Sequence, residues 1–272
     1  MLLLARLLPL LLLFALGCYH NDGPAANPAP LPPPCRIVKA TYKTIYLSGP
    51  KTGYEALTID GQTYKVYTWE TIEYVYDYKG RITRQLSTSW GGSSSLSFGY
   101  AEKYIFRRRE NADSKGAIAQ TVLDTVRLNA KGYDDQYIYD EQGNLLTYKS
   151  WAKTAVVKIE AQNRVYHSEP YDGGRLNYSW TFDLNRPALP PIYAYQGVGD
   201  RNLVTTRLLT VQNLGYITNG PAIRTDFSYI YDASGRVARQ MEVDYRYPLS
   251  NWSFENHPGG IGITDYQYEC FN

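Results

Sequence analysis

The sequence has few of the features that mark helical proteins or metalloproteins. No window of twelve residues repeats its apolar positions with the period of an amphipathic helix, which argues against an α-helical fold. Only 3 histidines are present. His167 has Glu169 and Asp172 nearby, but this loose spacing does not indicate a metal site, and a partly exposed histidine at a strand end is the simpler interpretation. We therefore predict no metal site and no cofactor.

Motifs that position a nucleophile or a phosphate are also missing. The chain has no Gly-x-Ser-x-Gly, no His-Glu-x-x-His and no glycine-rich phosphate loop. Ser48-Gly-Pro-Lys51 and Lys51-Thr-Gly53 match short motifs of penicillin-recognising enzymes, but they overlap within one turn, which indicates coincidence. Asp134 and Asp135 lie beside an expected turn, where solvent exposure is usual. No catalytic residue is predicted, although a glycosidase can carry its two acids anywhere in a β-fold, so an enzymatic role stays open.

Net charge is small, because 28 lysines and arginines are balanced by 26 acidic residues. This balance predicts neither nucleic acid nor anionic lipid as a partner. The densest run of charge is Arg107-Arg-Arg109. In a strand, Arg107 and Arg109 share one face and Arg108 lies on the other, so we interpret the run as a solvated strand end that discourages edge-to-edge pairing.

Tyrosine, in contrast, is abundant, with 27 residues against 7 phenylalanines. We expect these rings to lie on half-buried sheet faces, with their hydroxyl groups reaching water. Many belong to a frame, Tyr-x-Tyr-Asp-x-x-Gly-(Arg/Asn)-aliphatic, that occurs at residues 74–82, 137–145 and 229–237. The alternating tyrosines favour a strand, and the aspartate can accept hydrogen bonds from the N–H groups that follow it. The glycine permits the left-handed conformation that closes a type I turn with a G1 bulge.

Each copy of this frame predicts a β-hairpin. The turn-forming residues are Asp77 and Gly80, Asp140 and Gly143, and Asp232 and Gly235. A hairpin of this geometry pairs an aromatic with an aliphatic side chain across its strands, namely Tyr76 with Ile82, Tyr139 with Leu145 and Tyr231 with Val237. Asn129 and Gly132 repeat the turn with asparagine as its first residue, so a three-stranded meander is expected around Tyr133–Tyr139.

These residues resemble the YD repeat of Rhs-type surface proteins, and more closely the bacterial lipoproteins of unknown function that contain a few divergent copies. The resemblance covers most of the chain after Cys35. It implies a fold and a cellular location, and it implies no reaction.

The fold class we predict is all-β, an antiparallel meander of twisted β-hairpins with roughly a dozen strands. A sheet of this size can stay open or curl into an open barrel. Alternating apolar and polar residues predict the strands outside the frames. They are expected at Arg36–Leu47, Leu57–Tyr64 with an Asp60-Gly61 turn, Leu96–Arg109, Trp151–Tyr166, Leu203–Val211, Ile223–Tyr231 and Ile263–Cys270.

Several segments between these strands carry loop signals. Trp90–Ser95 is rich in glycine and serine and is expected to be a flexible loop, while Ala101–Tyr104 fits either a strand or a helix. The residues from Tyr171 to Leu176 look like a frame turn shortened by one residue. The prolines of Arg186–Ile192 exclude a central strand and predict a long connection that runs to about Asp200.

The start of the chain predicts export and a lipid anchor. Leu7–Leu16 is apolar, follows one positive charge at Arg6, and is shorter than the ~20 residues of a membrane-spanning helix. Ala15-Leu-Gly-Cys18 looks like a lipobox, so residues 1–17 are predicted to be a signal peptide and Cys18 to carry the lipid. Tyr19 rather than aspartate follows, which favours the outer membrane and leaves its face, cell surface or periplasm, open.

A tether and one β-domain are expected after the anchor. Six of the eleven residues 24–34 are proline, which predicts an extended tether over residues 18–34 and a single β-domain over 35–272. Cys35 and Cys270 are the cysteines left once Cys18 carries lipid, in a protein exported to an oxidising compartment. They flank the domain, as in the related lipoproteins, so a disulfide between them is expected, with two unrelated thiols as the alternative.

Aromatic residues in expected loops indicate a ligand-binding surface. Trp90 borders the Gly/Ser loop, and Trp252, Phe254 and His257 lie in the last loop, Pro248–Gly262. Exposed rings bind sugars or proteins by stacking, unless they fold back to cover the sheet. We predict a lipid-anchored envelope module that binds or scaffolds glycan or protein. A hydrolase of envelope polysaccharide, and a structural protein whose sheet edges pair with copies or partners, are the alternatives.

Overall fold

The computed structural model describes residues 35–45, 54–149, 155–171, 174–214, 217–246 and 259–270. These residues form sixteen β-strands and one short 3-10 helix, so the all-β prediction is confirmed and the expected number of strands was too low. No helix in these ranges is long and apolar enough to cross a membrane. The elements are β1 (Cys35–Thr44), β2 (Glu55–Ile59), β3 (Gln62–Tyr76), β4 (Ile82–Ser89), β5 (Gly92–Tyr100), β6 (Tyr104–Ala112), β7 (Ile118–Arg127), β8 (Tyr137–Tyr139), β9 (Leu145–Tyr148), β10 (Val156–Glu160), β11 (Asn163–Tyr171), β12 (Gly174–Pro187), η2 (Ala194–Gln196), β13 (Asn202–Leu214), β14 (Ile217–Tyr231), β15 (Val237–Arg246) and β16 (Gly260–Cys270).

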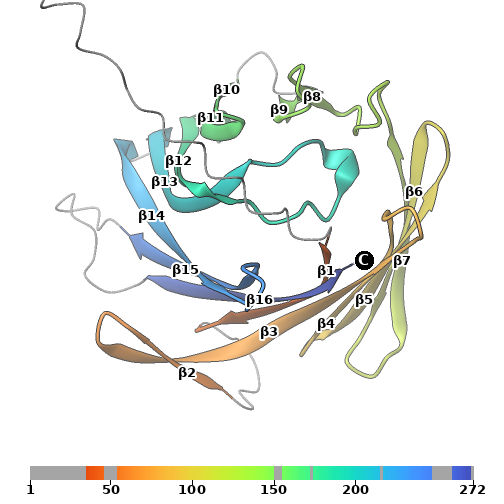
Figure 1. Ribbon diagram of the computed structural model, residues 1–272, viewed down its shortest axis with the longest axis horizontal. Coiled ribbons are helices and arrows are strands. Elements are labelled where there is room, and N and C mark those ends of the chain that lie inside the picture. Colours follow the sequence, from red (N-terminus) through yellow and green to blue (C-terminus); the bar gives the residue numbers. More distant parts are fainter. Residues whose placement is uncertain are drawn as a thin grey trace, which may run out of the picture. The chain divides into compact units, whose positions relative to one another are not determined.

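Fourteen strands form one antiparallel sheet. Its order is β10-β11-β12-β13-β14-β15-β16-β1-β3-β4-β5-β6-β7, and β2 pairs with β3 beside this order. Strands β10 and β7 are its two ends, so the sheet is open and not closed into a barrel. The first and last strands meet in the middle of the order, where β1 pairs with β16. Figure 1 shows the strands along an arc, with the connection between β12 and β13 on its inner side.

The frame turns form the expected hairpins. Gly80, Gly143 and Gly235 have φ angles of 77°, 91° and 78°, in the left-handed region that favours glycine. The cross-strand pairs are those predicted, because Tyr76 faces Ile82, Tyr139 faces Leu145 and Tyr231 faces Val237. A register shift directly before each tyrosine marks the bulge that a three-residue loop requires.

A further copy of the same turn lies at Asp113-Ser-Lys-Gly116, between β6 and β7. The Asp113 carboxylate accepts hydrogen bonds from the N–H groups of Lys115 and Ala117 at 2.9 and 3.0 Å, and Gly116 has a φ of 81°. Asn129 accepts the equivalent bond from Lys131 at 2.9 Å. The Asp-x-x-Gly spacing was visible in the sequence, but no flanking tyrosines marked this copy.

Four tyrosine hydroxyl groups bond to neighbouring strands, so the expectation that the hydroxyl groups reach water is wrong for these four. They donate hydrogen bonds to backbone carbonyl oxygens: Tyr76 to Ile37, Tyr100 to Ile82 and Tyr229 to Val204, each at 2.7 Å, and Tyr268 to Val237 at 2.9 Å. A carbonyl oxygen next to a bulge or strand end has a lone pair that the sheet ladder does not use. A phenylalanine ring at such a position would leave this acceptor unbonded.

Side chains pack on both faces of the sheet. On the face called inner here, the connection 188–201 packs against the main core, which consists of Ile37, Ala40, Ile72, Tyr74, Ile82, Phe98, Ile105, Val126 and Tyr195. On the outer face, the β2–β3 hairpin contributes Val66 to a smaller core with Ile261 and Ile263. Lys43 reinforces this contact, since its Nζ lies 2.6 Å from Glu55 and 2.7 Å from Asp265.

The disulfide between Cys35 and Cys270 is present and confirms the predicted pairing. The two residues are opposite each other in the β1–β16 ladder, and their Cα atoms are 4.0 Å apart. The bond therefore joins two strands that the ladder already holds side by side.

Several local predictions were wrong. The expected Gly/Ser loop is largely strand β5, because its serines pair with Ala112, Asn111 and Glu110 of β6. Residues 101–103 are neither strand nor helix but the tight turn between β5 and β6, closed by a bond from the Ala101 N–H to the carbonyl of Tyr104, where β6 begins. Strand β16 begins at Gly260, inside the expected last loop, of which residues 248–258 lie outside the described residues.

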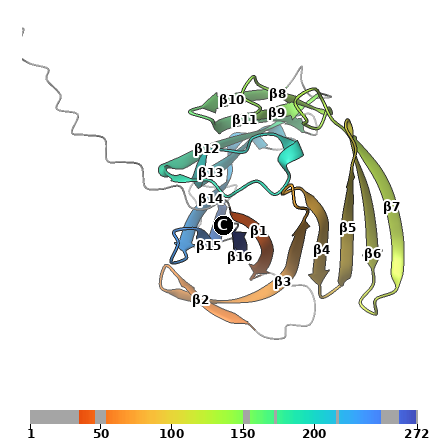
Figure 2. The same ribbon diagram turned by 45° about the vertical axis from the view of Figure 1, so that its right-hand side comes forward.

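The middle of the chain also differs from prediction. The expected three-stranded meander is a two-stranded sheet, β8–β9, which Figures 1 and 2 both show beside β10 and β11. The segment before it makes only one bridge, Leu128 to Asp134, because the Asp134 N–H donates to the Tyr195 carbonyl at 2.8 Å instead. Asp134 is 7% exposed, which corrects the expectation that it faces solvent.

Candidate ligand-binding cleft

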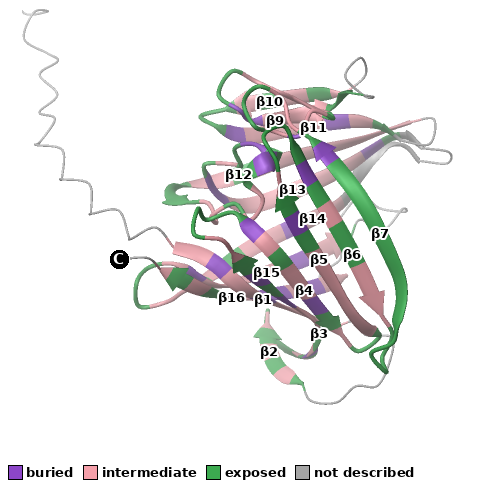
Figure 3. Cartoon of the chain, turned by 90° about the vertical axis from the view of Figure 1, so that its right-hand side faces the viewer, coloured by how far each residue is buried: buried purple, intermediate pink, exposed green. Residues whose placement is uncertain are grey.

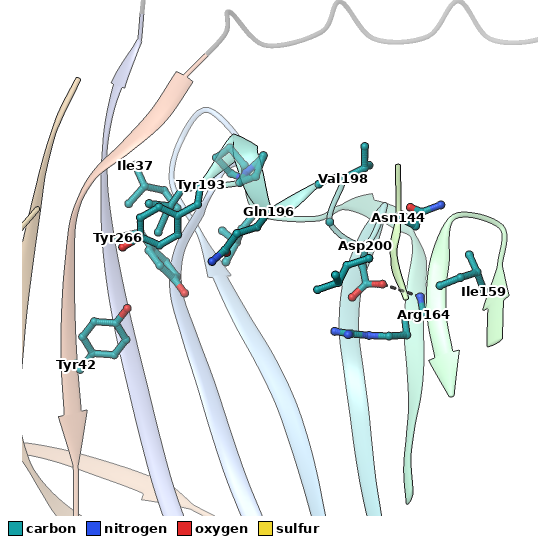
Figure 4. A pocket seen from close by; sticks show the side chains of 17 residues that line it. Ile37, Tyr42, Asn144, Ile159, Arg164, Tyr193, Gln196, Val198, Asp200 and Tyr266 are labelled. Carbon is teal, nitrogen blue, oxygen red and sulfur yellow. Dashed lines mark hydrogen bonds between the residues drawn. The ribbon is translucent and has the colours of Figure 1, made fainter. Parts of the chain in front are cut away.

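A cleft of about 380 Å³ opens on the inner side of the sheet. The connection 188–201 forms its floor, β1 and β16 form one wall, and β11 with the start of β9 forms the other. Figure 4 shows the tyrosines gathered on the first wall and the charged residues on the second. Its size is within the range of small-ligand sites, roughly 300–1,000 Å³.

The connection reaches this position because its backbone cannot continue β12. Pro187, Pro190 and Pro191 lack the N–H group that a central strand needs, and the chain leaves the sheet after Pro187. The prediction of a long connection to about Asp200 is thereby confirmed. Tyr195 in the middle of this segment is buried in the main core, so the floor of the cleft is fixed by packing.

The β8–β9 turn holds the other end of the connection. The Val198 N–H donates to the Gly143 carbonyl at 2.9 Å, and the two backbones approach closely. A Cβ on Gly197 would lie 2.6 Å from the Gly143 carbonyl oxygen, and a Cβ on Gly143 would lie 2.6 Å from the Tyr133 hydroxyl. Both positions therefore need glycine for space as well as for a positive φ.

The aromatic wall consists of Tyr42 from β1, Tyr266 from β16 and Tyr193 from the connection. Burial raises the pKa of the Tyr42 and Tyr266 hydroxyls and raises that of Tyr193 to about 12. Tyr193 also hydrogen-bonds to Gln85 of β4. These three groups stay neutral at ordinary pH, and their hydroxyl groups already have partners within the chain, so the rings are what this wall offers to a ligand.

The polar wall is built on Asp200 and Arg164. Asp200 Oδ1 accepts the Arg164 N–H at 2.6 Å, and Figure 4 shows the two side chains next to each other. Burial raises the pKa of the Asp200 carboxyl, although the N–H group and positive charge of Arg164 act in the opposite direction. The Arg164 guanidinium lies 5.1 Å from the centre of the Trp180 ring, which restricts its position.

A buried amide pair supports this wall from below. Asn163 Nδ2 donates to Asn202 Oδ1 at 3.0 Å, and Asn163 Oδ1 accepts the Asn202 N–H at 2.9 Å. Asn163 is 1% exposed. Asn163 directly precedes Arg164 and Asn202 lies two residues after Asp200, so their bonds fix the backbone on both sides of this wall.

The described lining of the cleft supplies one carboxylate together with neutral and cationic donors. Among the described residues that line it, Asp200 is the only carboxylate, and Asn144, Gln196 and Arg164 supply neutral and cationic donors. No group of three or more histidine, cysteine or acidic side chains in the described ranges could hold a metal ion. Stacking on tyrosine rings combined with planar hydrogen-bonding groups suits a polar ligand with an apolar face.

A second cleft of about 790 Å³ lies on the other side of the connection. It includes the cations Lys79, Arg81 and Lys131, but two of them are engaged. Arg81 pairs with Asp77 at 2.7 Å, and Lys131 donates to the Glu141 carbonyl at 2.9 Å. This cleft is therefore the weaker candidate for a ligand.

The site predicted from loop aromatics does not coincide with the cleft. Trp90 is 51% exposed at the β4–β5 turn and does not line the cleft, while Trp252, Phe254 and His257 lie outside the described residues, as does the predicted lipidation site Cys18. His167 lies within β11, with Nε2 3.0 Å from Glu169, a partly buried pair rather than a metal site.

The interpretation of Arg107–Arg109 as an edge-protecting run was wrong. These residues belong to β6, which pairs with β5 on one side and β7 on the other, so the run is not at an edge. Arg107 on the inner face interacts with Asp124 and with Tyr195. Its charge is therefore used within the domain.

Comparison with known proteins gives only distant similarity. No protein-family model matches the chain, and no curated protein matches it. A solved porin-like protein from Bacteroides uniformis ATCC 8492 is 14% identical, with 86% of this chain and 98% of that chain covered and a TM-score of 0.43. A porin-like protein from Bacteroides vulgatus ATCC 8482 is 11% identical, with 87% and 99% covered and a TM-score of 0.28. Neither similarity identifies a ligand, and the YD-repeat resemblance stays a prediction.

Proposed function

We propose that this protein is a lipid-anchored module of the bacterial cell envelope that binds a glycan in the cleft between β1, β16, β11 and the connection 188–201. The single observation that carries the proposal is the arrangement of that cleft, with tyrosine rings opposite a fixed Arg164–Asp200 pair. Sugars present apolar C–H faces together with hydroxyl groups, so rings on one wall and planar polar groups on the other match them.

The location in the envelope rests on the sequence. Ala15-Leu-Gly-Cys18 after an apolar run supports lipid attachment at Cys18, and Tyr19 supports the outer membrane. The proline-rich residues 24–34 would hold the domain away from the lipid surface. In that position the protein meets envelope polysaccharide.

A binding role is preferred to the polysaccharide hydrolase considered as the alternative. Hydrolysis by a pair of carboxylates requires one acid and one base or nucleophile on opposite sides of the bond. Asp200 lacks such a partner among the described lining residues, and its oxygen is held by the Arg164 N–H group.

The test is a glycan array probed with the full chain in detergent, followed by titration of the best ligand. Gln196→Ala removes an exposed amide from the cleft and is expected to weaken binding about five- to tenfold, the value of one hydrogen bond of ~1–1.5 kcal/mol. Gln267→Ala is the matched control, because Gln267 is also exposed but lies on β16 outside the cleft.

Equal affinity of the Gln196→Ala and Gln267→Ala proteins would place the ligand elsewhere and contradict the proposal. Absence of any glycan binding by the full chain would contradict it more broadly. Cleavage of the bound glycan during the titration would favour the hydrolase instead.

A further inference from the structure

The two ends of the sheet differ in how well they are protected against pairing with another strand. Strand β10 has 5 residues and carries Lys158 and Glu160, a charged pair 2.5 Å apart. Short length and charge are usual protections of an edge strand. Strand β7 has 10 residues and no proline, and every residue except Val126 is exposed, as the green strand in Figure 3 shows. It lacks the protection that β10 has.

The charges on β7 leave the centre of its outer face clear, because Asp124 lies on the inner face opposite Arg107 and Arg127 is the last residue of the strand. The Asp124 carboxylate is bonded to Arg107 of β6, and the Arg127 guanidinium lies 3.3 Å from Asp135. What remains on the strand is apolar or neutral, with Leu123 77% exposed and Ile118 64% exposed. An approaching strand would therefore meet no uncompensated charge.

The backbone of β7 offers hydrogen-bonding groups on its open side. The Leu128 N–H donates towards β6, to the Lys103 carbonyl, whereas the Arg127 carbonyl accepts the Asp135 N–H on the other side. Backbone groups alternate in direction along an antiparallel strand, so those of Thr121, Leu123 and Thr125 also point away from β6. No described strand of this chain pairs with them.

The outward-facing side chains in the middle of β7 form a row that is symmetric about its centre. Thr121, Leu123 and Thr125 lie at alternate positions of the outer face, with Leu123 in the centre. A two-fold axis that is perpendicular to the sheet and passes midway between two Leu123 residues would place Leu123 opposite its own copy and each Thr121 opposite a Thr125. Facing threonines stabilise adjacent antiparallel strands, and two facing leucines bury apolar surface. An isologous contact of this kind closes a dimer and leaves no repeating edge.

From this self-complementary row we infer that the protein forms a homodimer in which the β7 strands of two copies pair antiparallel, centred on Leu123. A groove beside the edge adds apolar surface to the contact. Its apolar lining includes Gly99, Leu123 and the exposed Phe106 ring, and Arg107, Arg108 and Asp124 complete it with charges that are paired within the chain. The inference concerns the sheet edge and is independent of the proposed glycan cleft.

Cysteine cross-linking of the full chain in detergent tests both the dimer and its register. Leu123→Cys is expected to give a covalent dimer with a short bifunctional thiol reagent, because the two thiols would face each other. Thr125→Cys alone is expected to give little, since its two copies would lie about 14 Å apart along the strands. A mixture of Thr121→Cys and Thr125→Cys chains is expected to cross-link. The unsubstituted chain is the control for Cys18.

A second measurement uses sedimentation of the same detergent-solubilised protein. The parent chain is expected to be a dimer, and Leu123→Lys, which places two ammonium groups opposite each other, is expected to raise the dimer dissociation constant at least tenfold. Leu184→Lys is the matched control, because Leu184 is similarly exposed on β12, away from β7.

A monomeric parent at all concentrations would overturn the inference. A dimer that survives Leu123→Lys, or that cross-links equally well through Thr125→Cys alone, would overturn the β7 register. Recovery of a different protein cross-linked to Leu123→Cys would show that the edge takes a foreign strand, and would overturn the second copy as its occupant.

Discussion

The same turn occurs in two different environments, at Asp140–Gly143 and at Asp232–Gly235. In both, the aspartate carboxylate accepts the N–H of the residue after glycine, at 2.7 Å for Asn144 and 3.0 Å for Arg236. A Cβ on Gly235 would meet nothing within 4 Å, whereas one on Gly143 would meet the Tyr133 ring. One turn is a free end of a hairpin, and the other is a packing surface that supports the floor of the cleft.

The residue after glycine differs between the two turns as well. The Arg236 side chain donates a hydrogen bond to Asp232 at 2.7 Å and lies over the Tyr268 ring. Asn144 makes the same bond to Asp140 at 2.8 Å with a shorter side chain, and it is buried. The frame thus fixes both turns, and in this pair the shorter residue belongs to the turn on which another segment packs.

The largest effect on stability is expected from removing the Cys35–Cys270 disulfide, which lies beside only one of these turns. Arg236 Nη1 lies 3.3 Å from Cys35 Sγ, so the disulfide adjoins the Asp232 turn. The double variant Cys35→Ser, Cys270→Ser should lower the free energy of unfolding by about 2–5 kcal/mol, since the bond closes a long loop. Denaturant unfolding measures this loss. Hydrogen exchange should quicken more at Gly235 than at Gly143, and equal or opposite changes would contradict the comparison.

Alanine at the two glycines tests the comparison most directly. Gly143→Ala should cost about 3 kcal/mol, because it adds a clash with Tyr133 to the strain of a positive φ. Gly235→Ala has only the strain, about 1 kcal/mol, and serves as the matched control. Thermal and denaturant unfolding of both variants gives the difference. Similar losses of unfolding free energy for the two variants would mean that the close contact with Tyr133 does not affect stability.

Exchanging the residues after glycine is expected to have a smaller effect that differs between the turns. Asn144→Arg forces a long charged side chain into a buried position and should cost about 2 kcal/mol. Arg236→Asn keeps a short partner for Asp232 and loses the contact with the Tyr268 ring, for about 0.5–1 kcal/mol. If Asn144→Arg costs no more stability than Arg236→Asn, the surroundings of the two turns do not determine which residue can follow the glycine.

The smallest expected effect is a dependence on pH. Partial burial raises the pKa of the Asp232 carboxyl, but the bonds from the Arg236 side chain and from the N–H groups of Arg236 and Ser234 outweigh it and lower the pKa. The stability from this group is present above the unfolded-state pKa of about 4 and is lost as pH falls through the lower folded-state value. Asp232→Asn should therefore flatten the acid limb of the stability curve, and an unchanged limb would contradict it.

The hairpins could be predicted from the sequence because their determinants are local. Asp77 and Gly80 lie within one turn, and the pairing of Tyr76 with Ile82 follows from turn geometry alone. The disulfide was predictable because few cysteines were available. The strand that includes Ser93–Ser95 was missed because its signal, a run of glycine and serine, describes a loop unless neighbouring strands hold it.

The cleft could not be predicted, because its parts are distant in the sequence. Tyr42 and Tyr266 meet only through the β1–β16 pairing, and nothing local distinguishes them from other tyrosines. The connection 188–201 brings Asp200 next to Arg164. Its prolines predicted where the chain leaves the sheet, but they did not predict which face of the sheet the segment would cover. The one available signal was the pair Tyr193 and Tyr195, two large rings inside a proline-rich segment that needed somewhere to pack.

The pairing of β1 with β16 also has a consequence for how the domain assembles. Apart from this seam, the described sheet joins strands that are near in sequence, so strands β1–β7 and strands β10–β16 can each grow by successive hairpins. The seam joins residues 235 apart and waits for the last strand to arrive. The first half therefore carries β1 as an open edge until β16 pairs with it. The Cys35–Cys270 bond can then hold the two strands of the seam together.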